Sequence, residues 1–153
     1  MRVKLYRWRD EQWKERGVGN CKLMRDKAAR RVRVVMRQEK TLKPVGNFML
    51  SESPLCELVP MANNDKAWVW SCKDYSEETE GSIEKLAARF QNAEAAKTFK
   101  EAFDAGKEFN SKAKVDGCKD EDLVWAPTVE DIEEPVVDDI DTNKTADADG
   151  DDK

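Results

Sequence analysis

Five cationic side chains lie within thirteen residues in the N-terminal part of the chain, at Arg31, Arg33, Arg37, Lys40 and Lys43. Three of them, Arg31, Arg33 and Arg37, share one face of the segment 31–37 if it is a strand, because side chains alternate across a strand. Concentrated positive charge attracts acidic partners and speeds their encounter. We therefore predict a docking surface for an acidic macromolecule, and the competing interpretation is an ordinary solvated sheet face.

Tryptophans mark two further candidate sites. The first is the run Trp13, Lys14, Glu15, Arg16 and Gly17, which we predict to bind a partner because Trp and Arg are favoured interface anchors. The second is the pair Trp68 and Trp70, whose i, i+2 spacing places both on one face of a strand. That spacing fits a partner-binding face and a core position equally well.

Catalytic chemistry has little support in the sequence. The chain of 153 residues contains no histidine, so it has no Ser-His-Asp or Cys-His constellation and no imidazole metal ligand. Gly17-Val18-Gly19 lacks the third glycine and the following helix of a phosphate-binding loop. Carboxylates are densest in a C-terminal tail that cannot preorganise them. We expect no catalytic residues, no cofactor and no metal.

Cysteine usage indicates a reducing compartment. The four cysteines, Cys21, Cys56, Cys72 and Cys118, form no CxxC pair. The chain starts on a strand pattern rather than a secretory signal, and no apolar run is long enough to cross a membrane. We therefore predict free thiols, with the first three cysteines acting as small hydrophobic residues in or beside strands. A cytosolic or nuclear location follows from this interpretation.

The overall charge of −5 hides two unlike parts. Residues 1–114 carry 24 basic and 17 acidic side chains, a net +7, whereas residues 115–153 carry 3 basic and 15 acidic ones, a net −12. The acidic part is poor in aromatic residues and cannot bury enough apolar area to offset its ordering entropy. We predict a basic folded body followed by a disordered acidic tail.

The pattern of hydrophobic residues predicts short strands followed by one helix. Alternation favours strands at 3–9, 12–16, 21–25 and 31–37, with a turn at Asp10-Glu11 and a break or bulge at 17–20. Further short strands are expected at 41–43, 47–50, 55–59 and 67–72. Asn92 is a good N-cap for a helix over 93–109. The segment 83–91 fits a helix by propensity and a strand by alternation.

Four segments together resemble the Ran-binding domains of the Ran-binding protein 1 family. They occur in the family's order and cover residues 3 to about 108. In sequence they are WKERGVG (13–19), VMRQEKTLK (35–43), DKAWVW (65–70) and RFQNAEAAKTF (89–99).

The resemblance implies a pleckstrin-homology-like fold, a mainly β barrel or sandwich of seven strands closed by a C-terminal α-helix. It makes 85–90 the last strand and starts the helix at Asn92. We expect this domain to span residues 1–112 and the acidic disordered tail to span 113–153.

The resemblance also implies a binding module rather than an enzyme. Such a module holds the GTP-bound small GTPase Ran, assists its GTPase-activating protein and helps release Ran from importin-β-type receptors. Ran's acidic C-terminal extension wraps onto these domains, which makes Arg37, Lys40 and Lys43 the first candidates for that contact. We expect a monomer in the cytoplasm, with the nuclear pore or shuttling into the nucleus as further locations, and no membrane or nucleic-acid partner.

Two other functions fit a basic β domain. One is binding of single-stranded nucleic acid, through Tyr6, Trp8 and Trp13 and phosphate contacts. The net −12 tail argues against it, because that charge repels a phosphate backbone. The other is binding of phosphoinositides, although no basic loop stands apart from the strands to favour it.

Overall fold

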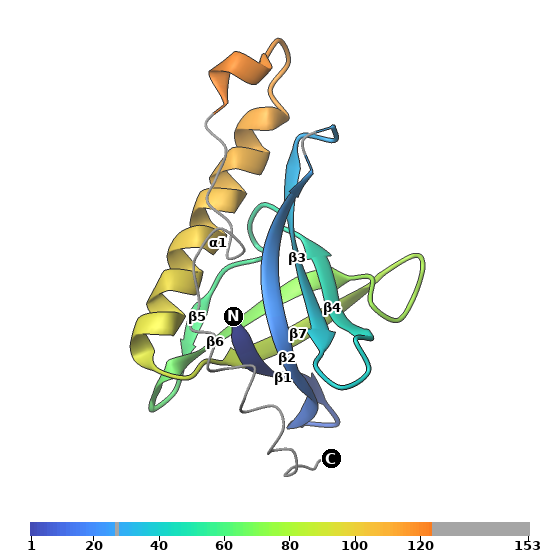
Figure 1. The fold of residues 1–153 in the computed structure, drawn as a ribbon, viewed down its shortest axis with the longest axis vertical. Helices are drawn as coiled ribbons and strands as arrows, with labels where there is room; N and C mark the ends of the chain where they lie inside the picture. The colour runs from blue at the N-terminus through green and yellow to red at the C-terminus, as the bar shows by residue number, and fades with distance from the viewer. Residues whose placement is uncertain (27, 124–153) are drawn as a thin grey trace.

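The computed structural model describes residues 1–26 and 28–123 as a seven-stranded antiparallel sheet with one long helix. The strand order is β4-β3-β2-β1-β7-β6-β5, and a further pairing between β4 and β6 brings the two halves of the sheet together. Helix α1 runs along the side of the curved sheet (Figure 1). The bounds are β1 Arg2–Arg9, β2 Gln12–Asp26, β3 Arg31–Gln38, β4 Pro44–Met49, β5 Val59–Met61, β6 Asn64–Asp74, β7 Ser82–Arg89 and α1 Ala93–Ala113, followed by the short 3-10 helix η1, Asp120–Asp122. The expected fold class, mainly β with one C-terminal helix, is confirmed.

Strands β1 and β2 form a tight hairpin. Asp10 and Glu11 both have positive φ, 55° and 62°, as a two-residue type I′ turn requires. The expected strands at 12–16 and 21–25 are one continuous strand, so a break at 17–20 is wrong. A bulge does form, but just before the expected range: Leu5 pairs with Gly17 and Tyr6 with Glu15, which leaves Arg16 as the extra residue.

Two of the short strands expected from the sequence are loops. Leu42 has φ 62° and its N–H donates to the Gln38 carbonyl at 2.7 Å, so residues 41–43 are a loop and β4 starts at Pro44. Cys56 has φ 55°, and residues 55–58 form a bend and an irregular segment before the three-residue strand β5. A left-handed backbone interrupts the extended conformation that alternation alone would predict.

The C-terminal half of the domain follows the expectation from the family. Residues 82–89 form strand β7, and the Asn92 side chain caps α1 by accepting a hydrogen bond from the Ala95 N–H at 2.7 Å. The helix extends to Ala113, beyond the expected end at 109. The boundary between domain and tail at 112 and 113 stays a prediction, and residues 124–153 of the expected disordered tail lie outside the described residues.

The core is a group of aromatic rings between the sheet and α1. The ring centroid of Trp70 lies 6.1 Å from that of Phe103 and 5.7 Å from that of Phe48. The ring centroids of Phe90 and Phe99 are 4.8 Å apart. The four cysteines are thiols and not disulfides, and Cys21, Cys56 and Cys72 are buried. Burial raises the pKa of the Cys56 and Cys72 thiols above the ordinary value. Among the described residues, no helix has the length and apolar character that a membrane crossing requires.

One buried polar side chain fastens α1 to β3. Asn110, which is 6% exposed, accepts a hydrogen bond from the Val32 N–H at 2.8 Å and donates to the Val32 and Leu50 carbonyls, both at 2.9 Å. One helical turn earlier, Gly106 permits a close approach, because an added Cβ would lie 2.5 Å from Leu50 Cδ1. The helix therefore fixes the position of the strand that carries the cationic residues.

Candidate partner-binding surface

Strand β3 presents its cations on the outer side of the sheet. Val32, Val34 and Met36 are at most 2% exposed and face the core. Arg31 and Arg37 alternate with them and are exposed, while Arg33 is half-buried. The predicted alternation of this strand is confirmed.

The loop between β3 and β4 folds back on the end of the strand. Arg37 Nη1 donates to the Leu42 carbonyl at 3.0 Å, and the Thr41 hydroxyl donates to the Gln38 side-chain carbonyl at 2.8 Å. Lys40 and Lys43 belong to this loop and are exposed. Because the loop is folded onto Arg37, the two lysines extend the positive charge of the strand. We call these five residues the basic face: Arg31, Arg33, Arg37, Lys40 and Lys43.

The charges of the basic face are not neutralised by nearby carboxylates. Within residues 1–26 and 28–123, none of its five cations forms an ion pair. The Arg33 Nε is buried and has no hydrogen-bond partner in that same part of the chain. An anionic partner would therefore find donors without first breaking an internal ion pair, whose loss would offset part of the gain.

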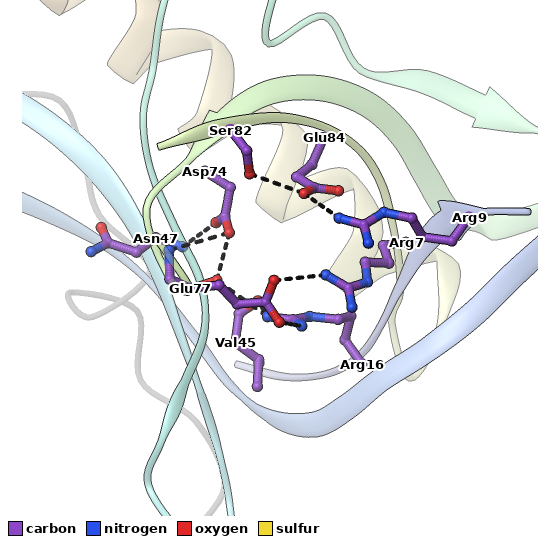
Figure 2. Close-up of polar contacts among 10 residues, drawn as sticks. Arg7, Arg9, Arg16, Val45, Asn47, Asp74, Glu77, Ser82 and Glu84 are labelled. Atoms are coloured by element: carbon purple, nitrogen blue, oxygen red, sulfur yellow. Dashed lines mark hydrogen bonds and ion pairs between the residues drawn. The ribbon is translucent and has the colours of Figure 1, made fainter. Parts of the chain in front are cut away.

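Arg16 does not belong to the exposed surface. Its side chain is only 13% exposed, and Figure 2 shows it pointing with Arg7 toward Glu77. Arg16 Nη1 lies 2.6 Å from Glu77 Oε2 and Arg7 Nη1 lies 3.0 Å from Oε1. These hydrogen bonds, with that from Arg16 the stronger, lower the pKa of Glu77 to about 2. Arg16 Nη2 also donates to the Val45 carbonyl at 3.1 Å and to the Ser76 hydroxyl at 3.2 Å.

The Arg16 contacts join strand β2 to β4 and to the β6–β7 loop. Two buried carboxylates tie down the ends of the same loop (Figure 2). Asp74 accepts a hydrogen bond from the Asn47 N–H at 2.8 Å, and Glu84 accepts from Arg9 Nη2 at 2.7 Å and from the Ser82 hydroxyl at 3.0 Å. We interpret Arg16 as a clamp within the domain, an assignment that the residue type and its neighbours did not indicate.

Trp13 belongs to a partly exposed aromatic cluster that the sequence pattern does not reveal. Its ring meets that of Trp8 edge to face, with 5.1 Å between centroids. Lys85 Nζ lies 5.4 Å from the Trp8 ring and 5.9 Å from the Trp13 ring, and Trp8 is 40% exposed. The two-residue turn determines this pairing, because it sets Trp8 directly opposite Trp13. Beside the cluster lies a small hollow of about 150 Å³, lined mainly by apolar residues, Tyr6, Met61 and Ala87 among them.

The other residues of the predicted 13–17 site have ordinary surroundings. Lys14 pairs with Asp10 at 2.9 Å, and Glu15 pairs with Lys4 at 3.7 Å. Both side chains are exposed, whereas Gly17 is buried opposite Leu5. The segment thus presents Trp13, Lys14 and Glu15 outward and keeps Arg16 and Gly17 within the domain.

Trp68 and Trp70 both contact helix α1. Trp70 is 4% exposed, so a surface role for it needs correction: its ring fills the core. Trp68 is partly buried, and its indole N–H donates to the Ala96 carbonyl at 2.8 Å while Lys100 Nζ lies 5.9 Å from its ring. Both tryptophans hold α1 against β6.

Comparison with known proteins identifies the family to which the chain belongs. The family model described as the RanBP1 domain matches residues 1–109. The chain belongs to the RanBP1 domain family. The matched residues include every strand and most of α1, so the RanBP1 domain contains the basic face, the aromatic cluster and the Arg16 clamp.

Relatives of this RanBP1 domain occur in proteins of very different length. The chain is 47% identical over 109 residues to a Ran-specific GTPase-activating protein homolog of Dictyostelium discoideum, covering 67% of this chain and 55% of that protein. It is 38% identical over 105 residues to the human E3 SUMO-protein ligase RanBP2, covering 67% of this chain and 3% of that protein. The chain therefore spans about half the first relative and a small part of the second.

Proposed function

We propose that this RanBP1 domain binds the small GTPase Ran in its GTP-bound form. Family membership and the names of the relatives support Ran as the partner. The observation that carries the proposal is the basic face, in which five cations on β3 and the following loop have no ion pair among the described residues. Such a surface suits an acidic segment. The resemblance to the family implies that the acidic C-terminal extension of Ran is that segment.

The aromatic cluster supplies a second contact in this proposal. A partly exposed Trp pair next to a small apolar hollow is suited to anchor a partner, because aromatic anchors contribute strongly to interface energy. The basic face would govern the rate and salt dependence of association, since charged surfaces steer encounter. Trp8, Trp13 and Lys85 would govern the lifetime of the complex.

In the proposed role, the domain is an accessory module without chemistry of its own. It assists the Ran GTPase-activating protein and helps release Ran from importin-β-type receptors, acting as a monomer in the cytoplasm or at the nuclear pore. The absence of histidine from the sequence fits this role. Binding of phosphoinositides or single-stranded nucleic acid is not favoured, because the family match points to a protein partner.

Capture of Ran loaded with GTP or GDP tests the proposal. We expect strong preference for the GTP form and loss of binding at high salt. Arg37→Glu should weaken binding at least tenfold, about 1.4 kcal/mol, whereas the matched charge reversal Lys97→Glu on the exposed side of α1 should not. Equal capture of both nucleotide forms contradicts the proposal. Normal binding by Arg37→Glu removes the basic face from it.

A further inference from the structure

The last described residues lie against the start of the basic face. Arg30, in the turn between β2 and β3, forms an ion pair with Asp120 at 3.1 Å and donates through Nη2 to the Cys118 carbonyl at 2.9 Å. Leu123 is only 7% exposed and belongs to the hydrophobic core. Residue 123 is thereby held near the end of the domain where β3 begins, and Arg31 follows directly after Arg30.

The chain that continues from this point is strongly acidic. Residues 124–153 contain 11 acidic and 2 basic side chains, a net −9. The cations of β3 and its loop, by contrast, have no carboxylate partner in the described part of the chain. Opposite charges are therefore joined in one polypeptide, and their attachment point is beside the cationic strand.

We propose that the acidic segment 124–153 binds the basic face of its own domain and competes there with an acidic partner. The contact is intramolecular and electrostatic, and its effect is autoinhibition. Only the competition rests on the proposed function. The contact itself follows from the charge of the segment and from where residue 123 is anchored.

The lengths involved permit this contact. Strand β3 has eight residues, about 27 Å at 3.4 Å per residue. A chain of 30 residues has an end-to-end distance of about 30 Å if it behaves as a random coil. The segment can thus cover the whole basic face from its anchor. Its effective concentration there is on the order of millimolar, which is enough for a weak ionic contact to be populated.

The five cations of the basic face form no ion pair within residues 1–26 and 28–123, which favours carboxylates as ligands. Each exposed contact contributes on the order of 0.2–1 kcal/mol, so several must act together, and salt must weaken them. We therefore expect an ensemble of contacts along Arg31, Arg33 and Arg37 and not one fixed pose. A partner with a similar acidic segment would displace them in a salt-dependent manner.

Two charge-matched variants of the full chain test the contact. The tail variant carries Glu130→Gln, Asp131→Asn, Glu133→Gln and Glu134→Gln. The control carries Glu94→Gln, Glu101→Gln, Asp104→Asn and Glu108→Gln on the exposed side of α1. The measurement is the NMR chemical shift of the backbone amides of residues 31–37. We expect these amides to shift in the tail variant and to stay unchanged in the control.

The result that overturns the contact is an unchanged β3 spectrum in the tail variant. Shifts that grow with protein concentration also overturn it, because they indicate the tail of a second molecule. The competition has its own readout, the association rate with GTP-bound Ran at low salt. The tail variant should associate about two- to tenfold faster than the control, as expected when a competitor at millimolar effective concentration is weakened.

The two proposals fail in different ways. If no variant binds Ran, the proposed function is wrong, and the NMR comparison still decides whether the segment contacts the basic face. If the amides shift but both variants associate with Ran at the same rate, the contact stands and the autoinhibition is refuted.

Discussion

The sequence motif around Arg16 predicts a partner contact, whereas the structure places its side chain in hydrogen bonds within the domain. Replacement by alanine removes hydrogen bonds to the Val45 carbonyl at 3.1 Å and to the Ser76 hydroxyl at 3.2 Å, about 1 kcal/mol each. It also removes the ion pair with Glu77, whose side chain is 46% exposed, so this pair contributes about 0.5 kcal/mol after solvent screening. The buried aliphatic part of the Arg16 side chain adds a further contribution, so Arg16→Ala should lower the free energy of unfolding by about 3 kcal/mol in total.

A loss of that size is easy to measure. Urea unfolding followed by tryptophan fluorescence should show a free energy of unfolding about 3 kcal/mol lower, and calorimetry a melting temperature about 10 °C lower for a domain of this size. The matched control is Lys14→Ala, two residues away in the same segment. The ion pair of Lys14 with Asp10 is solvent-exposed, so replacing Lys14 should lower the free energy of unfolding by at most about 0.5 kcal/mol.

The binding assay completes this test. Measured well below the melting temperature, Arg16→Ala should keep its affinity for GTP-bound Ran within about threefold, because the lost contacts are internal. The reasoning is refuted if Arg16→Ala unfolds like the wild type while its binding is lost. Arg16 would then be a partner contact and not a clamp.

Three further predictions concern stability. Asn110→Ala should lower the free energy of unfolding by about 3 kcal/mol, because three buried hydrogen bonds are lost. Asn92→Ala removes only the helix cap and should lower it by about 1 kcal/mol. Urea unfolding measures both changes. The pKa of Glu77 is about 2 in the folded domain, below its ordinary value of 4.5. Its contribution to stability is therefore present above about pH 4.5 and lost as the pH falls toward 2, and Glu77→Gln should remove that part of the acid dependence in calorimetry. Trp70→Ala should cost about 3–5 kcal/mol, whereas Trp8→Ala should cost under about 1 kcal/mol, and equal losses would contradict the assignment of Trp70 to the core.

Much of the basic face was predictable because it depends on local alternation. The run RVRVVMR has its apolar residues on one side at period two, and Val32 and Val34 are accordingly buried. The helix start was equally local, since Asn92 has the side chain that a cap requires. The segment 83–91 differs from these. Residue propensity favours a helix and alternation favours a strand, and only the resemblance to the family predicts the strand.

The parts that the sequence did not predict depend on backbone geometry and on distant contacts. Leu42 and Cys56 adopt positive φ, which no pattern of hydrophobic residues encodes. Arg16 faces inward because the bulge in β2 shifts the alternation at that residue. Its carboxylate partner Glu77 lies 61 residues away in sequence, so only the assembled fold brings the two together.

The shortness of β5 affects how the domain behaves next to other copies or domains. This outermost strand has three residues with Pro60 at its centre, and β4 at the other end of the sheet is joined to β6 at one residue pair, Phe48 and Asp74. Open sheet edges are templates for aggregation, and a short strand containing proline is a poor template. The domain can therefore be built into polypeptides of very different length, as its relatives indicate, without its sheet recruiting strands from its neighbours.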